Sequence, residues 1–344
     1  MLTRRSFALS SGAALLLASC GRKEIKTLRV AAVGGAAGKN SSTSNVTLAH
    51  VKGFYDEEFA RDGIKVEVVY LTGTGPAINE AFAQGQADFA EYGGLPNVIG
   101  LAGGAPTKLV VARHTALTYY LAVKRGSPIR RVEDLRGRKI ALQKGTMPHL
   151  LLVQILEKHG LDEKTVSIVN LQSAEATAAF LSGAVDAQFG TTTLLPLRDQ
   201  GRLEVIASTK ELPQGINLGG FLANADLEKA HPDLVARMTK VMVKTYHWAS
   251  LDENRDELLR LYARSGIPEH YYAEEFPLPL RQRFSPLIDP QVTDGYRRIA
   301  AFAKDHDLIR RLPDFDSWFL PAYQQKAIKD LGLVGYWAPS PGQA

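Results

Sequence analysis

The sequence predicts an α/β protein of two lobes, in which mixed sheets are flanked by helices and the C-terminal region is helical. From residue 27 onward, short apolar strands alternate with helical segments, a pattern typical of a sheet covered by helices on both faces. The alternation starts again after Tyr120. Segments 81–88 and 179–186 share alanine, phenylalanine, glycine and aspartate at the same spacing, which indicates two lobes of similar construction. The turn residues that commonly separate helices and strands in α/β proteins are an alternative source of such short identities.

The individual elements follow from the apolar segments and the turn residues between them. The first round predicts strands at 27–33, 64–70, 87–92 and 108–112, and helices at 45–60, 76–84 and from Pro96 onward. The second round predicts strands at 119–124, 139–142, 166–170 and 185–189, and helices at 149–159 and 174–181. Beyond Ala223 the pattern is mainly helical. In the repeated unit, Gly85 and Gly183 are placed to end a helix in the left-handed conformation.

This order of elements predicts that the second lobe is inserted into the first. We assign 27–117 and 218–338 to a discontinuous first lobe, 118–217 to the second lobe, and 339–344 to a frayed tail. The insertion explains why a sheet pattern restarts in mid-chain and why the chain ends in a helical region.

The N-terminal residues predict an export signal. Arg4 and Arg5 precede an apolar run of 11 residues, 8–18, which is shorter than the roughly 20 residues that span a bilayer. Residues 17–20 resemble a bacterial lipobox, and 3–7 resemble a twin-arginine signal. We therefore expect 1–19 to be removed, Cys20 to be lipidated, and 20–26 to tether the body to a membrane in the periplasm or at the cell surface. A core helix with an ordinary buried cysteine is the alternative.

The composition excludes several classes of function. The chain of 344 residues has a formal net charge of +5 without a lysine or arginine block, so nucleic acid is not an expected partner. Cys20 is the only cysteine, which excludes an intramolecular disulfide and leaves no thiol for catalysis in the body. The eight histidines lack ligand spacing, and no catalytic motif is present. We expect no metal, no cofactor, no catalytic residues and no enzymatic activity.

Small and hydroxylated residues collect where predicted strands end, which is where open α/β sheets bind ligands. Free amides at helix N-termini make such loops suited to anions, although a tight turn is the other interpretation of each glycine cluster. The spacing of Gly34, Gly35 and Gly38 disfavours a dinucleotide fold. We predict that the ligand is bound by Gly34, Gly35, Thr72, Gly73, Tyr92, Gly93, Gly94, His114, Gly145, Thr146, Met147, His149, Gly190 and Thr191.

Cationic and aromatic side chains near these loops have two interpretations. His149 is placed to donate to a bound anion or to be an ordinary capping residue. Side chains that could reach the cleft, or simply be solvated, are Lys39, Arg113, His114 and Lys144. Tyr119, Tyr120 and Trp248 could pack an apolar ligand tail or belong to the core, and Arg281 and Arg283 could cover the mouth of the cleft.

Segment 131–140, followed by Lys144-Gly145-Thr146, resembles a stretch of the periplasmic substrate-binding proteins of sulfonate, taurine and nitrate ABC importers. Segments 85–89, 183–187 and 315–319 extend the resemblance over roughly 27–335. It implies the type II periplasmic binding protein fold, with two crossover strands and hinge closure on the ligand. It also implies an ABC permease as partner and a monomeric protein. The family often has an acidic residue near Gly94, which could receive an amine. The glycine at this position makes taurine a less favoured ligand than a sulfonate without an amine.

The resulting expectation is an extracytoplasmic lipoprotein that captures a small organic anion, an aliphatic sulfonate in the first place, and delivers it to an ABC permease. Taurine, nitrate or a pyrimidine precursor of thiamine are alternative ligands. A desulfinase or pyrimidine synthase of the same fold, or a sensory module, are alternatives of other classes. The absence of a suitable cysteine argues against the two enzymes.

Overall fold

The computed structural model describes residues 25–34, 43–72, 74–114, 118–213 and 217–339. The signal segment with Cys20, the predicted site residues Gly35 and Gly73, and residues 340–344 lie outside this part of the chain. No helix within the described ranges combines the length and apolar character that a membrane crossing requires.

The first sheet has five strands in the order β2-β1-β3-β10-β4. Its strands are β1 (Thr27–Val33), β2 (Lys65–Leu71), β3 (Phe89–Gly93), β4 (Thr107–Arg113) and β10 (Gly219–Asn224). β1 pairs in parallel with β2 and β3, whereas β10 is antiparallel to both of its neighbours, β3 and β4. The sheet is therefore completed by a strand that comes more than a hundred residues after β4.

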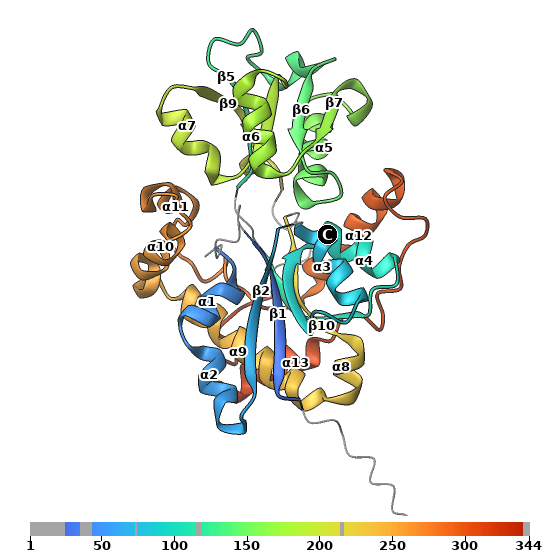
Figure 1. The fold of residues 1–344 in the computed structure, drawn as a ribbon, viewed down its shortest axis with the longest axis vertical. Helices are drawn as coiled ribbons and strands as arrows, with labels where there is room; N and C mark the ends of the chain where they lie inside the picture. The colour runs from blue at the N-terminus through green and yellow to red at the C-terminus, as the bar shows by residue number, and fades with distance from the viewer. Residues whose placement is uncertain (1–24, 35–42, 73, 115–117, 214–216, 340–344) are drawn as a thin grey trace, which may run out of the picture.

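The second sheet repeats this topology in the order β7-β6-β8-β5-β9. Its strands are β5 (Tyr120–Lys124), β6 (Lys139–Leu142), β7 (Ser167–Asn170), β8 (Ala187–Gly190) and β9 (Leu203–Ser208). Here β5 is the antiparallel strand, and it occupies the position that β10 has in the first sheet. The chain passes between the sheets twice, from β4 to β5 and from β9 to β10, and the predicted fold class is confirmed (Figure 1).

The repeated sequence unit has the same role in both sheets. Gly85 and Gly183 end α3 (Thr74–Ala83) and α6 (Ser173–Ser182) with φ of 64° and 87°. The aspartate that follows precedes a strand, and it accepts a backbone hydrogen bond from the parallel neighbour of that strand, which is β1 in the first sheet and β6 in the second. Asp88 Oδ2 accepts from the amide of Arg29 at 2.7 Å, and Asp186 Oδ2 accepts from that of Lys139 at 2.8 Å. The shared aspartate therefore ties equivalent strands together in the two lobes.

Helices cover the faces of both sheets. The first sheet is flanked by α1 (Asn45–Val51), α2 (Phe54–Phe59), α3 and α4 (Gly94–Ala102), and the second by α5 (Met147–Lys158), α6 and α7 (Leu195–Asp199). The single helix predicted at 45–60 is wrong, because Gly53 adopts φ of 72° between α1 and α2. After β10, the C-terminal region consists of α8 (Ala225–Ala230), α9 (Pro232–Ser250), α10 (Arg255–Ala263), α11 (Glu269–Glu275), α12 (Pro290–Asp305) and α13 (Pro321–Asp330).

The C-terminal helices complete the first lobe and extend toward the second. α9 packs against α1 and α13, and its buried face includes Val235, Met242 and Tyr246. α10 and α11 lie to one side of the gap between the sheets, and α12 lies to the other (Figure 1). This arrangement places helical segments from residues 255–305 beside the space between the two lobes.

Candidate ligand-binding site

A cavity of about 360 Å³ lies between the two sheets. It adjoins the carboxyl ends of four strands, because Gly93 of β3, Arg113 of β4, Leu142 of β6 and Gly190 of β8 line it. Ligands of open α/β sheets bind at such strand ends, where loops lead into helix N-termini. The topology therefore places this cavity where a ligand could contact both lobes at once.

The cavity brings together part of the predicted site. Six of the predicted residues line it: Tyr92, Gly93, Thr146, Met147, Gly190 and Thr191. Gly34, Thr72, Gly94, His114, Gly145 and His149 are not among the lining residues. Gly34 donates its amide to Leu71 O at 2.9 Å, Gly94 donates to Leu218 O at 2.8 Å, and Thr72 is exposed. Gly145 forms the left-handed turn before α5, with φ of 71°.

Arg113 is the cation that the strand end presents to the cavity. Its Nε is buried and has no hydrogen-bond partner among the described residues, and its Nη1 lies 3.8 Å from Glu91 Oε1. The next residue, His114, faces away and its Nε2 lies 2.7 Å from the carbonyl oxygen of Leu287. Successive side chains of a strand point to opposite sides, so Arg113 and not His114 reaches the ligand space.

Glu91 is a fully buried carboxylate in the wall of the cavity. Its Oε2 accepts from the amide of Asn45 at 3.0 Å, and its Oε1 accepts from Asn45 Nδ2 at 2.9 Å and from the Tyr246 hydroxyl at 3.3 Å. These donors fix the carboxylate in place. Arg113 and Arg283 also line the cavity. Two cationic side chains therefore accompany one acidic side chain, and this formal excess of positive charge favours an anion.

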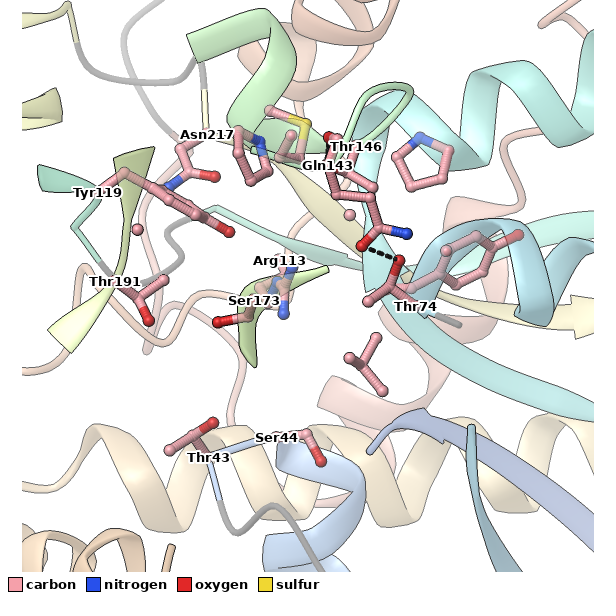
Figure 2. A pocket seen from close by; sticks show the side chains of 18 of the residues that line it. Thr43, Ser44, Thr74, Arg113, Tyr119, Gln143, Thr146, Ser173, Thr191 and Asn217 are labelled. Atoms are coloured by element: carbon pink, nitrogen blue, oxygen red, sulfur yellow. Dashed lines mark hydrogen bonds between the residues drawn. The ribbon is translucent and has the colours of Figure 1, made fainter. Parts of the chain in front are cut away.

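Hydroxyl and amide side chains surround the space around Arg113 (Figure 2). They come from both lobes and are Thr43, Ser44, Thr74, Gln143, Thr146, Ser173, Thr191 and Asn217. Thr74 Oγ1 donates to Gln143 Oε1 at 3.0 Å, which joins the start of α3 to the end of β6 across the cavity (Figure 2). Neutral donors of this kind can hold the oxygens of an oxyanion without adding further charge.

Further contacts hold the lobes together around the cavity. The Leu95 amide donates to Met147 Sδ at 3.2 Å, and a Cβ on Gly93 would come within 2.8 Å of Met147 Cγ. On the other side, Arg198 of α7 pairs with both carboxylate oxygens of Glu274 at 3.1 and 3.2 Å. In this structure the two lobes are therefore in contact on both sides of the cavity.

His149 belongs to a polar cluster beside the cavity. Its Nε2 lies 3.1 Å from Glu163 Oε1, outside hydrogen-bond geometry, and burial lowers the pKa of its imidazole. Glu163 also accepts from Lys144 at 3.0 Å and lies 2.9 Å from His306 Nδ1. Burial opposes ionisation of Glu163, but Lys144, His149 and His306 outweigh it and lower its pKa to about 2. His149 and Lys144 are thus engaged with Glu163.

Sequence reasoning named Tyr92, Tyr119 and Arg283, which line the cavity, but it missed the acidic residue and most of the aromatic residues of the lining. Glu91 is hidden within an apolar strand. The missed rings come from α9 to α11 and the following loop, where only Arg281 and Arg283 had been considered; they are Tyr246, Tyr262, Phe276 and Phe284. No local sequence signal separates such rings from ordinary core residues. Among the described residues, no cluster of histidine, cysteine and acidic side chains could hold a metal ion.

Two lobes of one topology around a cavity lined from both define the class of two-lobed α/β binding proteins. The chain belongs to the NMT1/THI5-like family, whose model matches residues 40–254.

Named relatives are similar over most of their length. A Bacillus subtilis (strain 168) protein named as an aliphatic sulfonates-binding protein is 31% identical over 256 residues, which are 72% of this chain and 74% of that protein. The crystal structure of a protein from Methylobacillus flagellatus KT, named as the periplasmic sulfonate-binding protein SsuA of an ABC transporter, is 33% identical with a TM-score of 0.80. The match covers 93% of this chain and 98% of that one.

The same fold also occurs in an enzyme. The desulfurization enzyme DszB has a TM-score of 0.66 at 17% identity, over 89% of this chain and 99% of that one. This likeness concerns the fold alone.

Proposed function

We propose that this protein captures a small organic sulfonate outside the cytoplasm and delivers it to an ABC import permease. The observation that carries the proposal is Arg113, whose buried Nε lies unpartnered among the described residues in a cavity that both lobes line. An unsatisfied buried donor is costly, and an anion at this position would remove that cost. The relatives named as sulfonate-binding proteins support a sulfonate as this anion.

Hinge closure is the mechanism that this site favours. A ligand between Arg113 of the first lobe and hydroxyl donors such as Thr146 and Thr191 of the second would stabilise the closed form, because it contacts both lobes only there. Residues 27–117 and 218–338 would then move as one lobe against 118–217. Six predicted residues, Tyr92, Gly93, Thr146, Met147, Gly190 and Thr191, are retained in the proposed site, and Arg113 is added.

Binding without turnover is part of the proposal. The relatives above carry the names of binding proteins, and Cys20 is the only thiol of the chain, at the predicted lipidation site. A lipid on Cys20 would keep the protein close to the permease as a monomeric receptor.

Calorimetric titration of the purified protein with ethanesulfonate, taurine, nitrate and sulfate tests the proposal. We expect ethanesulfonate to bind with one site and to be recovered unchanged. Arg113→Gln should lower its affinity by about tenfold to a hundredfold, since a hydrogen bond to a charged group contributes about 1.5–3 kcal/mol. Arg113→Lys keeps the charge and should bind more tightly than Arg113→Gln, and the exposed Arg130→Gln serves as control.

Three results would contradict the proposal. One is tighter binding of nitrate or sulfate than of any sulfonate. Another is equal affinity of Arg113→Gln and Arg130→Gln. The third is conversion of the sulfonate during incubation.

A further inference from the structure

One end of the cavity is walled by aromatic rings from the C-terminal helical region. Tyr262 of α10 and Phe276 at the end of α11 have ring centroids 5.3 Å apart, and Phe276 stacks on Phe284 at 5.8 Å with 9° between the planes. All three rings line the cavity, and the guanidinium of Arg283 lies 4.3 Å from the centre of Phe276. These contacts form one continuous wall, which we call the helical wall (Tyr262, Phe276, Phe284).

A second pair of rings lines the cavity from the other lobe. Tyr119, directly before β5, stacks on Phe189 of β8 at 5.5 Å with 25° between the planes. Leu171 and Ala176 of the same lobe add apolar surface to the lining. We call this pair the strand wall (Tyr119, Phe189).

Hydrogen bonds to Glu275 connect the two segments that carry the walls. The amide of Thr118 donates to Glu275 Oε2 at 2.9 Å, and the hydroxyl of Tyr120 donates to its other oxygen. Tyr119 therefore lies between two residues that bind Glu275, and Phe276 directly follows it. Arg113 acts electrostatically on Tyr119, where it opposes the rise in pKa that burial causes, and both side chains line the cavity (Figure 2).

We propose that the sulfonate taken up by this protein carries an aromatic ring, with the sulfonate group at Arg113 and the ring between the helical wall and the strand wall. This inference rests on the proposed function. The size of the cavity supports it, since about 360 Å³ is more than twice the roughly 150 Å³ of an engineered cavity that holds benzene. A sulfonate with one or two carbon atoms would leave most of the apolar end unfilled.

Aromatic walls distinguish a ring from an alkyl chain of the same carbon number. Offset-stacked and edge-to-face ring pairs gain free energy beyond the apolar area that they bury. We therefore expect benzenesulfonate to bind about threefold to tenfold more tightly than hexanesulfonate, and both to bind more tightly than ethanesulfonate.

Calorimetric titration of the purified protein with benzenesulfonate, hexanesulfonate and ethanesulfonate tests this order. Benzenesulfonate as the tightest of the three supports the inference. Equal or tighter binding of hexanesulfonate or ethanesulfonate overturns the inference and leaves the proposed function standing. Failure of all three sulfonates to bind overturns the proposed function itself.

Matched variants locate the ring. Phe189→Leu and Phe284→Leu each remove one aromatic face from a different wall, so the inference can be tested with either if the other fails to fold. Phe180→Leu, which alters a buried phenylalanine of the second lobe outside the lining, is the control. We expect both cavity variants to lower benzenesulfonate affinity about threefold to tenfold and ethanesulfonate affinity less than twofold. An unchanged ratio of the two affinities in the folded variants would overturn the assignment.

Discussion

The carboxylate of Glu163 in the second lobe lies 2.9 Å from Nδ1 of His306, at the end of α12 in the first lobe. Of the four groups in this cluster, only His306 comes from the first lobe, because Lys144 and His149 reach Glu163 from within the second. If the lobes separate as proposed, Glu163 loses one of its three partners and keeps two. The contact between Glu163 and His306 would therefore stabilise the closed form without touching the ligand.

Removal of this contact is expected to weaken ligand binding modestly. His306→Ala should lower ethanesulfonate affinity about twofold to fivefold, the range that corresponds to the loss of one partly exposed polar contact. The exposed His50→Ala, whose residue is remote from the lobe contacts, should leave it unchanged. Titration calorimetry measures both, and equal affinities in the two variants would show that Glu163 and His306 do not contribute to closure.

Gly93 and Met147 define how closely the lobes approach. A methyl group at Gly93 would lie 2.8 Å from Met147 Cγ, a distance that forces one lobe to move or the methionine to change rotamer. We expect Gly93→Ala to lower ligand affinity at least tenfold while the melting temperature without ligand stays close to that of the parent. Adding Met147→Ala should restore part of the affinity, and titration of the single and double variants measures this. No recovery in the double variant would contradict the proposed clash.

Gly219 supports the position of Arg113. A Cβ at this glycine would come within 2.6 Å of Arg113 Nη2 and 2.7 Å of the carbonyl oxygen of Tyr92. Because a backbone atom is involved, the strand cannot adjust freely, and Gly219→Ala should displace the guanidinium. Sulfonate affinity is expected to fall severalfold, with a loss of stability of about 1–3 kcal/mol. Titration and urea unfolding measure the two effects, and unchanged affinity would contradict a positional role for Gly219.

His159 provides a pH-dependent contribution to stability in the second lobe. Hydrogen bonds to Glu133 and Glu211 raise the pKa of its imidazole above 6.5. A raised pKa in the folded state means that the contribution is present below the unfolded value and is lost as the pH rises through the folded value. Urea unfolding should therefore show a larger difference between the parent and His159→Gln at about pH 5.5 than at about pH 9. A difference that is constant with pH, or larger at high pH, would contradict this assignment.

Much of the architecture could be predicted because it depends on local signals. The strand at 27–33 and that at 139–142 have the predicted bounds, and Gly85 and Gly183 adopt the expected left-handed conformation. β9 and β10 were not predicted, because segments 203–208 and 219–224 acquire their identity from antiparallel neighbours that lie far away in the sequence.

The binding site was predicted less completely, for two physical reasons. Loops at strand ends are readable, and Gly93, Thr146 and Thr191 do line the cavity. The side to which a side chain points at a strand end is not readable, so His114 was favoured over its neighbour Arg113. Rings such as Phe284 reach the cavity through the tertiary packing of the C-terminal region. No residue spacing in the sequence predicts that packing.

The position of β10 has a consequence for how this chain acquires its shape during synthesis. β3 and β4 are not hydrogen-bonded to each other, and the strand that joins them is made only after all of β5 to β9. We expect the contiguous second lobe to be able to fold as soon as its last strand has emerged from the ribosome, while the first remains in two unjoined pieces. A nascent chain stopped before residue 219 would thus expose the open edges of β3 and β4, the surfaces at which chaperone protection would matter most.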